Sequence, residues 1–136
     1  MQSGGFTHAV VTSTVPGTSL LTGQQLLNVP TYSASTSLVY MHPARPGTLV
    51  VRLSNVAVGP SKNLNYFLST VHAYDIANVR IGLVADRWSA YLFADNVANT
   101  MAALYTTHNY ALDIPSVNRI VTNPPRTVGL SLQYHY

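Results

Sequence analysis

Apolar and polar residues alternate over long stretches of this chain. The last stretch, residues 125–136, shows the alternation most clearly, because every second residue from Val128 to Tyr136 is apolar or aromatic and those between are small or polar. A period of two is typical of a β-strand with one apolar and one polar face. Similar runs occur along the rest of the chain. We predict six strands, at residues 5–15, 29–41, 47–59, 72–85, 87–97 and 125–136.

The connections between the predicted strands alternate in length. Residues 16–28, 60–71 and 98–124 form long connections, whereas the turns at 42–46 and near 85–87 are short. Outer-membrane β-barrels have short turns on the periplasmic side and longer loops outside. The predicted strands also exceed the usual length of about 5–6 residues and match the 9–11 residues of a tilted strand that crosses a bilayer. The predicted fold is all-β: an antiparallel up-and-down meander of about six long strands, as part of a transmembrane β-barrel.

Composition supports a membrane-facing surface. Apolar residues make up 47% of the chain and charged residues only 8%, whereas soluble domains carry about 25% charged residues. No run of about 18 apolar residues exists, so a membrane-spanning helix is not expected. A closed barrel is the other structure that satisfies all backbone polar groups in lipid. The net charge of +3 is scattered, which argues against a nucleic-acid partner.

The alternation assigns side chains to the two faces of the sheet. Arg52 and Arg80 fall on the polar face, and we expect both to face the barrel lumen, because an arginine in mid-bilayer lipid costs about 2–4 kcal/mol. Aromatic residues gather near strand ends, as in an interfacial girdle; these are Tyr40, Trp88, Tyr134 and Tyr136. The apolar face, which we expect to be exposed in an isolated sheet, contains Leu49, Val51, Leu53, Val79, Ile81, Leu83, Leu130 and Leu132.

Four segments resemble one family. The segment "RWSAYLFADNVANTMAAL" (87–104) is similar to the penultimate strand of TonB-dependent outer-membrane receptors, and "PPRTVGLSLQYHY" (124–136) is similar to their last strand. "NVPTYSASTSLVY" (28–40) and "YDIANVRIGL" (74–83) resemble earlier strands. The order matches the family's, although Tyr136 stands where Phe is commoner and His135 where Arg is frequent.

The resemblance implies that residues 1–136 are the C-terminal portion of a receptor barrel of about twenty-two strands, without its plug domain and N-terminal strands. The implied function is active uptake of a scarce nutrient, such as a ferric siderophore, across the bacterial outer membrane. The implied partners are outer-membrane lipid, a small-molecule substrate, the outer-membrane insertion machinery and, through the missing parts, TonB. The terminal strand would be the signal that this machinery reads, with Leu130, Leu132, Tyr134 and Tyr136 facing lipid.

Catalytic and metal sites are not expected, nor is any cofactor. The five histidines lack the close spacing of a zinc site. Asp86 and Asp95 flank one predicted strand and would lie about 30 Å apart, too far for paired carboxylate catalysis. Ligand-binding candidates are the polar aromatic residues of the loop 98–124, because such residues often line ligand sites. They are Tyr105, His108, Asn109 and Tyr110.

Two alternatives remain open. A soluble antiparallel β-sandwich also shows alternating strands separated by turns, and its tyrosine-rich loops would make it a binding module. Alternatively, several copies of a six-stranded sheet would together close one barrel.

Overall fold

The computed structural model describes residues 1–14, 22–64, 68–108 and 118–135. Strands are its regular elements in these ranges. They are β1 (Gln2–Phe6), β2 (Tyr32–Ala44), β3 (Gly47–Val58), β4 (Ser61–Leu64), β5 (Leu68–Val71), β6 (Tyr74–Val84), β7 (Trp88–Asp95), β8 (Ala103–His108), β9 (Asn118–Thr122) and β10 (Thr127–Tyr134).

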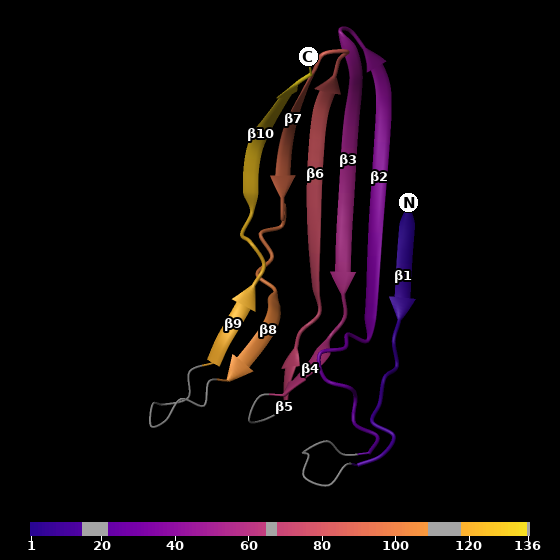
Figure 1. Cartoon of the computed structure of the whole chain (residues 1–136), viewed down its shortest axis with the longest axis vertical. Helices are drawn as coiled ribbons and strands as arrows, with labels where there is room; N and C mark the ends of the chain where they lie inside the picture. The colour runs from indigo at the N-terminus through magenta and orange to yellow at the C-terminus, as the bar shows by residue number, and fades with distance from the viewer. Residues whose placement is uncertain (15–21, 65–67, 109–117, 136) are drawn as a thin grey trace.

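Six of these strands form one antiparallel sheet in the order β1-β2-β3-β6-β7-β10. Two separate hairpins, β4–β5 and β8–β9, interrupt this meander without crossing it. The sheet is a long single layer, with both hairpins at one end and the short turns and C-terminal end of β10 at the other (Figure 1). The described sheet therefore confirms the predicted all-β meander of six main strands.

The pairing register sets which side chains share a face. β2 pairs β3 without interruption from Ser33↔Val58 to Ala44↔Gly47, and β3 pairs β6 from Thr48↔Val84 to Val58↔Tyr74. Directly opposed residues point to the same face, and a slip of one residue would exchange the two faces. The uninterrupted ladders thus keep the alternating residues of β2, β3 and β6 on the same two faces along their whole paired length.

The prediction for the first strand is wrong. β1 covers residues 2–6, and residues 7–14 lie outside the main sheet. These residues instead bond to the returning loop, with Val11 N donating to Gln24 O and Leu26 N donating to Ala9 O. The sequence in both stretches suits a strand, but only residues 2–6 have β2 alongside as a partner.

The second strand ends later than predicted, at Ala44 instead of residue 41. Pro43 lies within it, although proline cannot donate to a ladder. Ser37 N donates to Met1 O, so the backbone N–H of Ser37 points towards β1. Pro43 lies an even number of residues from Ser37, so its backbone nitrogen points to the same side, away from β3. β1 does not extend alongside Pro43, so no partner is lost there. No ladder bond to β3 is lost, as is usual for proline on an edge.

Burial shows no second layer. Within the described ranges the buried apolar residues are Val50, Val71 and Ala102, and no large side chain is fully buried. A β-sandwich requires a core between two inner faces, so the sandwich alternative is wrong for the part of the chain described. Those ranges also contain no helix long and apolar enough to cross a membrane.

Candidate functional site: the two faces of the sheet

Three rows of apolar side chains cross one face of the sheet, here called the outer face. Each row takes one residue from each of five adjacent strands, and the pairing register places these residues directly opposite one another. The rows are Leu38–Leu53–Val79–Ala94–Val128, Tyr40–Val51–Ile81–Leu92–Leu130 and His42–Leu49–Leu83–Ala90–Leu132. His42 is the one polar member.

The outer face is largely open. Leu92, Leu130 and Leu132 are 58%, 64% and 70% exposed. Of the eight residues predicted for this face, Leu53, Ile81, Leu130 and Leu132 are exposed and the other four are half-buried against their strand neighbours. A soluble monomer rarely exposes an apolar patch larger than a few hundred Å². A surface of this kind requires an apolar environment.

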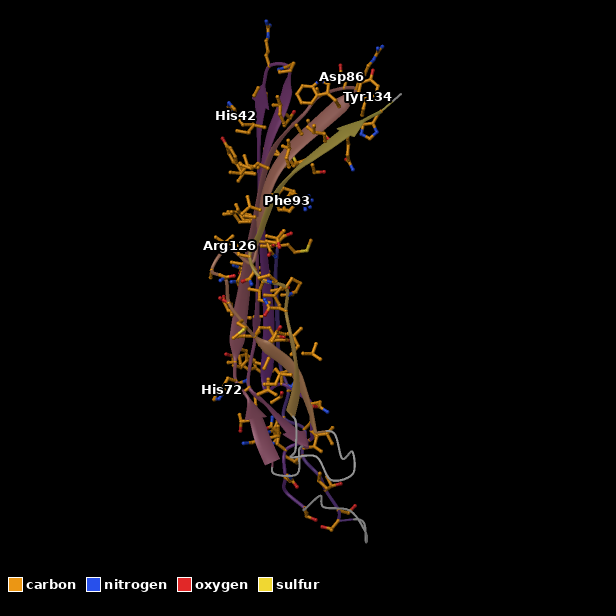
Figure 2. The ribbon with its side chains drawn as sticks, turned by 90° about the vertical axis from the view of Figure 1, so that its left-hand side faces the viewer. His42, His72, Asp86, Phe93, Arg126 and Tyr134 are labelled. Atoms are coloured by element: carbon orange, nitrogen blue, oxygen red, sulfur yellow. The ribbon has the colours of Figure 1, made fainter. Side chains whose placement is uncertain are left out.

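An aromatic pair bounds the outer face at the short-turn end. Trp88 and Tyr134 are directly opposite each other in the β7–β10 ladder. Together with the three apolar rows they extend about 20 Å along the strands, compared with an apolar band of about 25 Å in outer-membrane barrels. Tyr134, Asp86 and His42 lie at the same end of the sheet, and His72 lies towards the hairpin end (Figure 2).

Tyr40 does not belong to this girdle. It was predicted to lie beside a short turn, but β2 continues to Ala44 and places Tyr40 in the middle apolar row. Its ring stacks on His42, with centroids 6.3 Å apart and planes within 4°.

The opposite face, here called the inner face, carries Arg52, Arg80 and Asp95, whereas Asp75 of β6 lies on the outer face near the hairpin end. The central row of the inner face is Val39–Arg52–Arg80–Phe93–Gly129. Arg52 and Arg80 are therefore on the face opposite the apolar rows, and the guanidinium of Arg80 lies 5.6 Å from the centroid of the Phe93 ring. His42 and Phe93 project from opposite sides of the sheet when it is viewed edge-on (Figure 2).

Aromatic rings on the inner face lie over glycines of the neighbouring strand. The ring of Phe93 covers Gly129, where an added Cβ would come 2.5 Å from Phe93 Cζ. Tyr91 covers Gly82 in the same way, and a Cβ there would overlap the Tyr91 ring and the Ala90 carbonyl. These glycines are needed because the close contact leaves no space for a side chain.

We expect Gly129→Ala to lower the free energy of unfolding by about 1–3 kcal/mol, the usual cost of overpacking. In a Phe93→Ala background the same change should cost less than about 0.5 kcal/mol, since alanine suits a strand better than glycine. Urea titrations of the four proteins in detergent measure the difference. Gly5→Ala is the matched control, because no atom lies within 4 Å of its added Cβ; equal costs at both glycines would refute the packing explanation.

An asparagine network joins the end of β7 to the start of β10. The Asn96 side chain is 3% exposed; its Nδ2 donates to Thr100 O at 2.9 Å and Pro124 O at 3.0 Å, and its Oδ1 accepts from Thr100 N at 2.9 Å. Asn123 Nδ2 donates to the same two carbonyls, and Arg126 N donates to Asn99 Oδ1. The network fixes where β10 begins.

Sequence reasoning missed this network. The sequence does place asparagines at both ends of the connection between β7 and β10. Such residues indicate tight turns, because asparagine tolerates positive φ better than most residues. Asn96 and Asn99 have φ of 53° and 54°. The pattern indicates tight turns but not which carbonyls the amides reach.

The proposed ligand residues are only partly covered by the structure. Tyr105 and His108 belong to β8, which pairs β9. The structure describes the backbone of these two residues but not their side chains. Asn109 and Tyr110 lie outside the described residues altogether, as does Tyr136. Leu130, Leu132 and Tyr134 are on the outer face and exposed. Asp86 and Asp95 flank opposite ends of β7, and no group of three metal-ligating side chains occurs in the described ranges.

Comparison with solved structures finds the same arrangement in a larger protein. The chain superposes on the crystal structure of the ferric yersiniabactin uptake receptor FyuA from Yersinia pestis with a TM-score of 0.68 and 24% sequence identity. The match covers 82% of this chain and 17% of the receptor chain. Neither a protein-family model nor a curated protein matches the sequence. The chain therefore shares the fold of a section of that receptor chain.

Proposed function

We propose that this chain forms part of the wall of an outer-membrane receptor that takes up a scarce nutrient, most simply a ferric siderophore. The observation that carries the proposal is the set of three apolar rows, open to the surroundings on one face of a single-layered sheet. The likeness to a ferric yersiniabactin uptake receptor supports the substrate class. Gated transport is the mechanism, and the chain itself performs no catalysis.

The proposal gives each part of the chain a place. The outer face contacts outer-membrane lipid, the inner face with Arg52 and Arg80 lines the lumen, and the short turns lie in the periplasm. The β4–β5 and β8–β9 hairpins then lie outside the cell, where Tyr105, His108, Asn109 and Tyr110 contribute to the substrate surface. This orientation follows the rule that outer-membrane barrels have short periplasmic turns and long external loops.

The barrel extends beyond these residues in the proposal. β1 and β10 are the two edges of the described sheet, and an open edge within lipid leaves backbone groups without partners. We infer that further strands and a plug domain belong to the complete receptor, of which residues 1–136 form the C-terminal portion. TonB and the insertion machinery would act on that complete receptor, the latter by pairing with the terminal strand that contains Leu130, Leu132, Tyr134 and Tyr136.

Partition of the purified chain between water and lipid tests the proposal. After dilution from urea, we expect the chain to float with outer-membrane lipid vesicles and to gain strand content there, whereas without lipid or detergent it should aggregate. The apolar rows are the physical reason. A chain that remains folded, monomeric and monodisperse in buffer alone would contradict the membrane assignment.

A further inference from the structure

Two tight turns lie side by side at the short-turn end of the sheet. Arg45 belongs to the turn between β2 and β3, and Asp86 and Arg87 belong to the turn between β6 and β7. The two turns are in close contact, because a Cβ added at Gly47 would overlap the backbone carbonyl of Val84. Both arginines therefore lie on neighbouring turns at one end of the molecule.

The arginines of these turns have no anionic partner in the part of the chain that the structure describes. Arg45, Asp86 and Arg87 are exposed, and neither guanidinium has an ion pair or a hydrogen bond to a described residue. Asp86 lies at the extreme end of the sheet (Figure 2). Two arginines and one aspartate give the turns a net charge of +1, which favours an external anion.

Both arginines adjoin the aromatic end of the outer face. When the ladders are followed to the turns, Arg45 on β2 and Arg87 on β7 each come one residue beyond the row that contains Trp88 and Tyr134. His135 N donates to Arg87 O at 2.8 Å, which ties the end of β10 to the same turn. Aromatic side chains at a membrane interface lie at the level of the lipid headgroups. The arginines are therefore at the depth of the lipid phosphates.

A phospholipid matches this arrangement better than a free anion does. Guanidinium groups bind phosphate oxygens through pairs of parallel N–H···O bonds. In a phospholipid the phosphate is joined to acyl chains, which would lie on the apolar row His42–Leu49–Leu83–Ala90–Leu132. A free phosphate would gain only the contacts to the arginines. The net positive charge of the turns further favours a headgroup with a net negative charge over a zwitterionic one.

We propose that the two short turns bind the headgroup of an anionic phospholipid in the periplasmic leaflet. Arg45 and Arg87 hold the phosphate, and the acyl chains pass Trp88 and Tyr134 onto the outer face. The inference rests on the proposed function, which places the outer face in lipid and the short turns in the periplasm.

Fluorescence quenching of the whole chain in lipid vesicles tests the inference. Trp88 is the one tryptophan of the chain, so its emission reports the lipids beside the turns. The vesicles contain equal amounts of phosphatidylglycerol and phosphatidylcholine, and one of the two lipids is brominated near the carbonyl end of its acyl chains. We expect brominated phosphatidylglycerol to quench more strongly, with about a fivefold preference, the effect of one net basic residue near anionic lipid.

Single charge changes show whether the turns cause the preference. Arg45→Gln and Arg87→Gln each remove the net charge and should bring the preference close to one. Asp86→Asn should raise it, because the turns then carry two positive charges. Arg126→Gln is the matched control; Arg126 lies away from the short turns (Figure 2), so the loss of its charge should leave the quenching preference unchanged.

Equal quenching by the two brominated lipids in the unchanged chain overturns the inference, whether or not the variants fold. A preference that Arg45→Gln and Arg87→Gln both leave intact overturns it too. If inorganic phosphate removes the preference and chloride of the same ionic strength does not, the site binds free phosphate and the lipid source is overturned. Vesicle flotation is independent of these results, so a chain that floats but shows no preference contradicts this inference alone.

Discussion

Leu130→Arg should lower the free energy of unfolding in lipid vesicles by about 2–4 kcal/mol, the cost of an arginine on the lipid face near mid-bilayer. Leu130 is 64% exposed and belongs to the middle of the three apolar rows, between Leu92 on the neighbouring strand and the open edge of β10. Its side chain therefore lies far from both interfaces in the proposed orientation. Urea titration of strand content in vesicles measures the change.

Ser131→Arg is the matched control, because it places the same charge one residue further along β10. Ser131 is directly opposite Tyr91 on the inner face, where an arginine stays in contact with water. We expect a change within about 0.5 kcal/mol, as for most surface substitutions. Equal losses for the two variants would mean that the faces are assigned wrongly or that neither contacts lipid.

Asn96→Ala should lower the free energy of unfolding in detergent by about 4–5 kcal/mol. The substitution removes three side-chain hydrogen bonds of a 3% exposed residue, each worth about 1 kcal/mol. It also forces a residue with a Cβ but no local hydrogen bonding to adopt a φ of 53°, which costs about 1–2 kcal/mol. Urea titration followed by circular dichroism gives the loss.

Two further variants separate these contributions. Asn96→Gly accepts positive φ without strain and should recover about 1 kcal/mol relative to alanine while still lacking the bonds. Asn55→Ala removes a single bond to Asp75, and we expect a loss below about 1 kcal/mol. An Asn96→Ala loss no larger than the Asn55→Ala loss would show that the network does not fix the start of β10.

The central strands were predictable because each pairs with the next long strand along the chain. Residues 47–59 and 72–85 were predicted and β3 and β6 occupy Gly47–Val58 and Tyr74–Val84. Arg52 and Arg80 each interrupt an apolar alternation at the polar position, so the sequence alone assigns them to one face. That they are direct cross-strand neighbours depends on the register, which alternation does not determine.

The edges and the long connections were less predictable. Residues 7–14 have the composition of a strand, but pairing along the chain decides whether such a stretch joins a sheet, and here it bonds to residues 22–26 instead. The hairpins β4–β5 and β8–β9 were expected as loops. Short apolar runs within a long connection do not distinguish a hairpin from an irregular loop.

A scan of single cysteines along β10 tests directly whether the outer face contacts lipid. The chain contains no cysteine, so nitroxide labels at positions 130, 131, 132 and 133 report one site each in lipid vesicles. Labels at Leu130 and Leu132 should be accessible to oxygen and shielded from a water-soluble nickel reagent. At Ser131 and Gln133 the difference between accessibility to oxygen and accessibility to nickel should be smaller. Accessibility without a period of two would contradict the claim that the outer face contacts lipid.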